Sequence, residues 1–171
     1  MLQCIEEFHN HGYIHCDIKP GNYLLQPDSP CPIVLIDYGL SRQYIDPKTN
    51  EPVPENKVAG FVGTSKYMSI QVHQGCDTCP RDDIISLCYS LVEMIGGRLP
   101  WRLTEEAQMK KILKMKKTLP LDEVFGSLPP QIQTMYKYAM KLKYLDKPNY
   151  KLLFFLLNDA IEANNIKEKD P

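Results

Sequence analysis

HCDIKPGN, at residues 15–22, is the stretch of this sequence that decides its fold. It brings a carboxylate, an ammonium group and an amide close together in the chain, at Asp17, Lys19 and Asn22. A further carboxylate stands in the tripeptide DYG at residues 37–39. An Asp-Tyr-Gly tripeptide alone is a common turn, but the first motif is far more specific because several fixed positions must coincide. We therefore interpret the two motifs together.

Two short apolar runs lie between the motifs, at residues 23–25 and 33–36, and read as strands. The segment that joins the runs is rich in proline, which is typical of a turn. A hairpin of this kind would return Asp37 to the loop that carries Asp17 and Asn22. One local structure therefore explains both the order and the separation of the two motifs.

The residue types fit the transfer of a phosphoryl group. This reaction needs a carboxylate that orients the accepting hydroxyl, oxygen ligands that hold Mg²⁺ against the phosphates, and a cation that offsets the transferred charge. Asp17 fits the first requirement and Lys19 the third. Asn22 and Asp37 supply hard oxygen ligands for Mg²⁺. The sequence thus predicts catalytic roles for Asp17 and Lys19, and a nucleotide and metal site at Lys19, Asn22 and Asp37.

Most of the remaining sequence has a helical pattern. Apolar residues at helical spacing begin at Leu2, and again after Asp82, Pro130 and Asn149. Thr104 is expected to cap a further helix, with two glutamates in its first turn. We therefore expect a mainly α fold with a short β-hairpin at the loop of residues 15–22.

A single domain of residues 1–171 accommodates the whole pattern, with a flexible polar tail at 164–171. Residues 37–69 read as a long loop, and such loops inside a compact domain are usually functional or disordered. His9 and His11, near the end of the first helix, read as surface residues.

The composition restricts the possible partners. The chain has 20 Lys and Arg residues against 21 Asp and Glu residues, so no overall field favours nucleic acid or a membrane surface. The longest apolar run is too short to cross a bilayer, and no signal peptide is evident, so we expect no membrane insertion. The 6 cysteines are irregularly spaced and read as reduced thiols, which favours a cytoplasmic or nuclear protein.

HCDIKPGN resembles the catalytic loop of protein kinases, in the form that carries the Ser/Thr-specific lysine, and DYG resembles their Asp-Phe-Gly metal motif. The stretch VAGFVGTSKYMSI at residues 58–70 is similar to the casein kinase 1 superfamily, which has a Ser-Ile or Ser-Val pair in place of the usual Ala-Pro-Glu. Further matches are RDD at 81–83, LPW at 99–101 and DKPNY at 146–150. VAGF, with RQY at 42–44 and PWR at 100–102, leans toward the tau-tubulin kinase branch.

The resemblance implies the C-terminal lobe of a kinase and ATP-dependent phosphorylation of protein Ser or Thr, with Mg²⁺. It implies that Thr64 bonds to Asp17 and helps to select a hydroxyl-bearing side chain. It also implies that Asp83 anchors the catalytic loop through backbone amides. Cys16 stands where most kinases carry an arginine that pairs with a phosphorylated activation loop, which argues against control of that kind.

The family preference for acidic or pre-phosphorylated protein substrates suggests a role for Lys66. It would bind the acidic group together with Arg42 and the lysines of residues 110–117. The alternative for the lysine run is a solvated helix face, which is the commoner case.

No Gly-rich loop precedes the catalytic motif in this sequence, and no strand lysine with a helical glutamate partner is evident. We therefore expect that the N-terminal lobe is absent and that the chain alone is inactive. The alternative is a non-catalytic binding module, although such a module has no chemical need for the catalytic set.

Two cysteine features allow weaker interpretations. Cys76 and Cys79, with His73 nearby, could suggest zinc, but a second ligand pair is missing and two loop thiols are the better interpretation. Cys16, beside Asp17, is a hypothetical redox or covalent-inhibitor site.

Overall fold

The structure is a computed structural model that describes residues 1–26, 29, 32–56, 59–102 and 108–166. The elements, in chain order, are α1 (Leu2–Asn10), β1 (Tyr13–Ile14), the 3-10 helix η1 (Pro20–Asn22), β2 (Tyr23–Leu25), β3 (Ile33–Leu35), the 3-10 helix η2 (Tyr38–Leu40), β4 (Arg42–Gln43), α2 (Ile70–His73), α3 (Pro80–Gly96), α4 (Met109–Thr118), α5 (Leu121–Phe125), α6 (Pro130–Ala139) and α7 (Tyr150–Ala163). None of the described helices is both long and apolar enough to cross a membrane.

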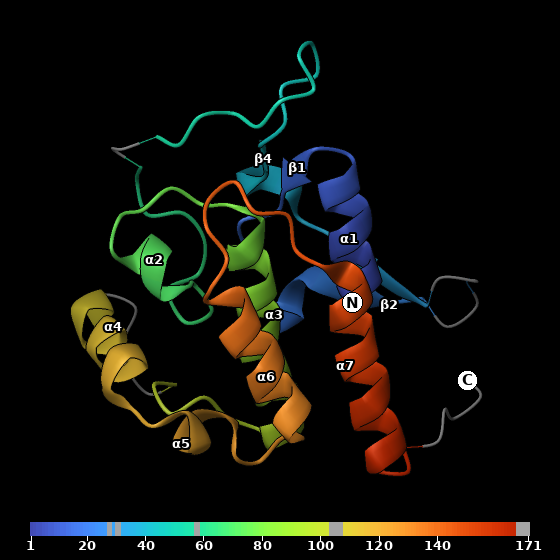
Figure 1. Ribbon diagram of the computed structural model, residues 1–171. Helices are drawn as coiled ribbons and strands as arrows, with labels where there is room; N and C mark the ends of the chain where they lie inside the picture. The colour runs from blue at the N-terminus through green and yellow to red at the C-terminus, as the bar shows by residue number, and fades with distance from the viewer. Residues whose placement is uncertain (27–28, 30–31, 57–58, 103–107, 167–171) are drawn as a thin grey trace.

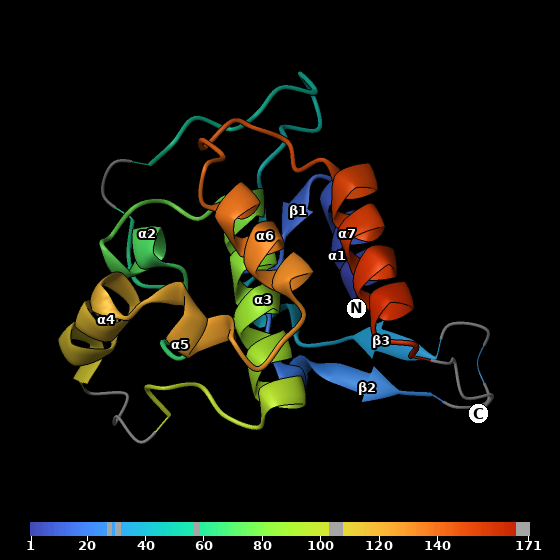
Figure 2. The ribbon, with the colours of Figure 1, turned by 60° about the horizontal axis from the view of Figure 1, so that its bottom comes forward.

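The mainly α fold with a short hairpin is confirmed. Strands β2 and β3 pair antiparallel, with Tyr23 opposite Leu35, and β1 pairs antiparallel with β4. Helix α3 runs through the middle of the molecule, with α1 and α7 on one side and α2, α4 and α5 on the other (Figures 1 and 2). The β2–β3 hairpin projects from the side of α1 and α7.

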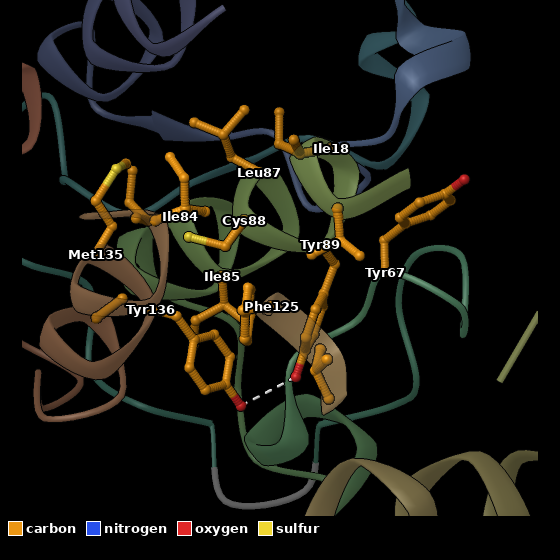
Figure 3. Packing of buried hydrophobic residues seen from close by; sticks show 14 of the residues in the cluster. Ile18, Tyr67, Ile84, Ile85, Leu87, Cys88, Tyr89, Phe125, Met135 and Tyr136 are labelled. Carbon is orange, nitrogen blue, oxygen red and sulfur yellow. Dashed lines mark hydrogen bonds between the residues drawn. The ribbon is translucent and has the colours of Figure 1, made fainter. Parts of the chain in front are cut away.

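Helix α3 is the centre of the core because its apolar residues surround the helix axis. Its side chains from Pro80 to Ser90 are almost all buried, and α3 packs on α1 and α6. Figure 3 shows Ile85 and Tyr89 of α3 against Phe125 of α5 and Tyr136 of α6, with the two tyrosine hydroxyls hydrogen-bonded at 3.0 Å. Each such large apolar side chain contributes about 1.5–3 kcal/mol through burial.

Two helix ends have clear capping features. Asn149 caps α7 by accepting a hydrogen bond from the Leu152 amide at 3.1 Å. Gly97 ends α3 in the left-handed conformation, at φ 77°, that glycine adopts readily. Trp101 is a buried core residue that is 1% exposed.

Other details differ from the prediction. Helix α3 begins at Pro80 rather than Asp82, because proline is well suited to the first turn. Its last turn leaves Ile95 58% exposed, although the apolar pattern continues there. The long loop predicted for residues 37–69 contains η2 and β4. The expected cap at Thr104 and the last five residues of the predicted tail lie outside the described residues.

Candidate active site

The loop that carries Asp17 is fixed at both ends by burial. Ile14 at the end of β1 and Ile18 after the aspartate are each 0% exposed. Between them, Cys16 adopts a left-handed conformation with φ 68°, which is uncommon for a residue other than glycine. The backbone therefore turns sharply just before Asp17, and the buried neighbours hold that turn in place.

Asp17 is the centre of a dense hydrogen-bond cluster. Its Oδ1 accepts bonds from the Thr64 amide at 2.8 Å and from the Thr64 hydroxyl at 2.7 Å. Its Oδ2 accepts a bond from the Lys19 ammonium at 2.6 Å, and Lys19 also donates to the Thr64 hydroxyl at 3.1 Å. Thr64 thus lies against Asp17, where the resemblance implied it.

The cluster sets the charge of Asp17. Burial alone would raise the pKa of this carboxyl, but the hydrogen bonds from Lys19 and Thr64 outweigh burial, so the pKa is lowered. The carboxylate is therefore ionised at neutral pH and can accept a hydrogen bond from an incoming hydroxyl. In a loose phosphoryl-transfer transition state, orienting the hydroxyl matters more than strong basicity.

Asn22 and Asp37 lie at the hairpin end of the cluster. The Asn22 amide nitrogen donates to the Asp17 carbonyl at 2.8 Å, so its oxygen is the atom that could face a cation. The Ile36 amide donates to the Asn22 carbonyl at 2.9 Å, which brings the chain before Asp37 beside Asn22. Asp37 itself is exposed, in a left-handed conformation, and its Oδ1 accepts from the Gly39 amide at 3.4 Å. Two oxygen donors suit Mg²⁺, which usually takes one or two protein ligands beside phosphates and water.

Gly63 permits the close approach of Thr64 to the loop. It has φ +97°, and a Cβ atom placed on it would lie 2.3 Å from the carbonyl oxygen of Cys16. Any side chain at residue 63 would therefore push the segment with Thr64 away from Asp17. This glycine lies within VAGFVGTSKYMSI at residues 58–70, and residue types alone assign it no role.

Asp83 joins the loop of residues 15–22 to α3, and its carboxylate is almost completely buried. Its Oδ2 accepts a bond from the His15 amide at 2.8 Å, and its Oδ1 accepts from the Cys16 amide at 3.0 Å. The geometry is thus that of an anchor acting through backbone amides.

The interpretation of His9 as a surface residue is wrong. His9 is 3% exposed, and its Nε2 donates to Asp83 Oδ2 at 3.0 Å. Its Nδ1 lies 2.5 Å from the hydroxyl oxygen of Tyr150 at the start of α7. The buried face of α1 consists of Leu2, Ile5 and His9, so the helical spacing itself contained the signal.

Two residues suggested for acidic substrates, Lys66 and Arg42, are each paired with a carboxylate of this chain. Lys66 forms an ion pair with Glu93 and lies 5.3 Å from the centre of the Tyr67 ring. Arg42 pairs with Asp77 and donates to the Thr78 carbonyl.

The lysines of α4 differ in burial. Lys110, Lys111, Lys114 and Lys117 are exposed, as a solvated face predicts, whereas Lys116 is 5% exposed. Lys116 follows Ile112 by one helical turn and therefore lies on the apolar face of α4.

The cysteines gain no special role. Burial, followed by the charge of Asp83, raises the pKa of the Cys16 thiol far above its usual range, so little reactive thiolate is present at neutral pH. Cys76 is exposed and Cys79 is buried. Among the described residues no group of three or more His, Cys, Asp or Glu side chains is placed to hold a metal ion, so the zinc alternative gains no support.

A model of the family described as "Protein kinase domain" matches residues 1–157. The chain is 36% identical to a probable serine/threonine-protein kinase of Dictyostelium discoideum, over 100% of this chain and 34% of that protein. It is 32% identical to a probable casein kinase I homologue of Encephalitozoon cuniculi, over 98% of this chain and 56% of that protein. It is 30% identical to casein kinase I homologue 3 of Saccharomyces cerevisiae, over 98% of this chain and 37% of that protein.

The chain thus spans between 34% and 56% of the length of these curated relatives. The family model covers the residues of the catalytic-loop cluster and the helical body around α3. Together with the casein kinase I homologues, this match shows that the chain belongs to the protein kinase family.

Proposed function

We propose that this chain is the C-terminal lobe of a Ser/Thr protein kinase of the casein kinase 1 superfamily, on its tau-tubulin kinase branch. In the proposed reaction, the γ-phosphoryl group of ATP passes to a Ser or Thr hydroxyl of a protein substrate. The observation that carries the proposal is the set of hydrogen bonds by which Thr64 and Lys19 hold the Asp17 carboxylate in one orientation.

The roles follow from the positions of the groups. Asp17 orients the substrate hydroxyl and accepts its proton as the phosphoryl group arrives. Lys19 is close enough to Asp17 to offset the charge of the transferred group. Asn22 and Asp37 would hold Mg²⁺, which neutralises charge on the ATP phosphates when bound.

The 171 residues contain no recognisable Gly-rich loop, so we propose that they have negligible phosphotransfer activity alone. The N-terminal lobe of a kinase covers ATP and excludes water, and without such a cover the phosphates are not positioned. We also propose a cytoplasmic or nuclear location, which is consistent with the free thiols Cys4, Cys16, Cys76, Cys79 and Cys88.

The test compares two samples under identical conditions with Mg²⁺–ATP and a protein substrate. One is the purified 171-residue chain, and the other is the native protein isolated with an antibody from the cells that produce it. Asp17→Asn variants of both are the controls, because asparagine keeps the shape but accepts no proton. We expect transfer by the native protein that falls by roughly 10²–10⁴-fold in its Asp17→Asn variant.

The 171-residue chain should not exceed its own Asp17→Asn control. Transfer by the native protein at the level of its control would instead favour the non-catalytic binding module.

We further propose that acidic or pre-phosphorylated protein substrates bind near Lys66. The ion pair of Lys66 with Glu93 is partly exposed, so an acidic substrate group would have to compete with Glu93 for the ammonium. Lys66→Glu in the native protein should therefore raise the KM for an acidic peptide and leave that for a neutral peptide nearly unchanged. Equal changes for both peptides would contradict this proposal.

A further inference from the structure

The segment directly after Thr64, residues 65–68, has every one of its backbone carbonyl groups held by a side chain of the helical body. Ser65 and Met68 carbonyls accept from the Lys116 ammonium at 2.8 and 2.6 Å, the Lys66 carbonyl accepts from Trp101 Nε1 at 2.9 Å, and the Tyr67 carbonyl accepts from the Ser86 hydroxyl at 2.9 Å. Backbone in an irregular segment is usually bound by other backbone groups or by water. Because side chains bind all four carbonyls, these contacts fix the position of residues 65–68 relative to the helices.

Lys116 is the unusual member of this set because it is a buried cation. Its ammonium lies 5.0 Å from the centre of the Tyr89 ring and 5.2 Å from that of Trp101, an arrangement that favours the charge. Burial nevertheless lowers the pKa of Lys116 well below its usual range. Burial of a lysine at this position costs solvation free energy. The ammonium in return makes two hydrogen bonds to one turn of backbone.

That turn leads directly to the catalytic carboxylate. The Thr64 carbonyl accepts from the amides of Tyr67 at 3.0 Å and Met68 at 3.1 Å, so residues 64–68 form one turn. The amide and hydroxyl of Thr64 at its start are the groups that bind Asp17. The Lys116 ammonium binds the same turn through the carbonyls of Ser65 and Met68.

We propose that Lys116 is a positioning residue for the phosphoryl transfer: by holding the turn of residues 64–68 against α4, it keeps Thr64 on Asp17. The catalytic part of this inference rests on the proposed function. Lys116 touches neither Asp17 nor the space in front of it, and acts only through the turn. Removal of the ammonium would leave the buried carbonyls of Ser65 and Met68 unsatisfied, and the turn would move toward water.

Hydrogen exchange in the purified 171-residue chain tests the contact without any need for activity. The test variant is Lys116→Met, which keeps the length and apolar stem of lysine but has no donor. The control is Lys117→Met, which removes an exposed lysine from the same helix. We expect the amides of Thr64, Tyr67 and Met68 to exchange ~10-fold faster or more in Lys116→Met, because opening of the turn becomes easier.

The amides of α3 and α6 should keep their protection in Lys116→Met, and Lys117→Met should match the wild-type chain throughout. Unchanged protection at Thr64 would overturn the proposal. Equal loss of protection in the turn, α3 and α6 would also overturn it, because Lys116 would then support the fold as a whole.

Kinetics in the native protein test the catalytic consequence. Lys116→Met should lower kcat by ~10-fold or more and leave the KM for ATP unchanged, when kcat is corrected for the folded fraction. A rise in the KM for ATP with unchanged kcat would overturn the positioning role. If the wild-type native protein transfers no phosphate, the catalytic role falls with the proposed function, whereas the exchange result still decides whether Lys116 holds Thr64.

Discussion

The two sides of the candidate site differ in how far the residues of this chain bury them and satisfy their hydrogen bonds. Around Asp17 the polar groups are buried or half-buried and are bound to fixed partners: Thr64 binds the Asp17 carboxylate, and Asp83 binds the amides of His15 and Cys16. The hairpin side is open: Leu25 is 76% exposed and Tyr38 is 54% exposed. Under the proposed function, the groups that would bind a substrate hydroxyl are preorganised within these residues, whereas the hairpin face would need a further covering surface to exclude water.

The largest expected effect is at Asp83, which anchors the loop of residues 15–22. Asp83→Asn replaces one carboxylate oxygen by a donor, which would face an amide of His15 or Cys16 or the His9 ring. A buried network broken in this way typically loses about 3–5 kcal/mol. We expect a loss of that size in the free energy of unfolding from urea denaturation.

The neighbouring residue provides a matched control. Asp82 is also buried, but it serves its own helix rather than the loop: its Oδ2 accepts from the Cys79 amide at 2.8 Å, and its Oδ1 lies 3.6 Å from Arg81 Nε. Burial raises the pKa of its carboxyl. Asp82→Asn keeps an oxygen acceptor for the Cys79 amide but loses the charge that faces Arg81, and should cost about 1 kcal/mol. Similar losses for both variants would show that the loop anchor is no more important than any buried carboxylate.

A smaller effect is expected where the segment with Thr64 meets the loop. Gly63→Ala places a Cβ against the Cys16 carbonyl at a positive φ, and should cost about 1–3 kcal/mol in unfolding free energy. Gly60→Ala is the control, because no atom lies within 4 Å of a Cβ at that glycine. Thermal unfolding of the two variants measures the difference, and equal melting temperatures would contradict the close approach described here.

The charge of Asp17 gives a pH-dependent effect. Because its pKa is lowered on folding, the ionised group stabilises the protein above the unfolded pKa, and this stability is lost as pH falls through the folded value. The stability difference between the wild-type chain and Asp17→Asn should therefore shrink as the pH is lowered from 7 toward about 3. Urea unfolding at several pH values measures it, and a constant difference would mean that Lys19 and Thr64 do not hold the carboxylate.

The sequence predicted which of these residues lie close together where residue identity and local spacing determine it. Asp17, Lys19 and Asn22 lie on one short loop, and the hairpin register brings Ile36 beside Asn22. Pattern alone was therefore sufficient for these positions. The apolar residues at helical spacing after Asp82 also predicted the helix α3, although not its place at the centre of the core.

His9 and Lys116 were missed for a physical reason. Both residue types are usually exposed, and only their position on an apolar helix face indicated burial. Their partners lie far away in the sequence, at Asp83 and at residues 65–68. Gly63 depends in the same way on a contact with Cys16 that no local pattern can show.

The smallest effect on the free energy of unfolding is expected on the open hairpin face. Leu25→Ser removes an apolar side chain that is mostly in water already, so the free energy of unfolding should change by less than about 0.5 kcal/mol. Leu35→Ser, on the paired strand, is the matched control because Leu35 is 4% exposed and should cost several-fold more. Urea unfolding of the 171-residue chain measures both. If Leu25→Ser were as costly as Leu35→Ser, the hairpin face would be covered in solution. The hairpin face would then not differ in burial from the surroundings of Asp17.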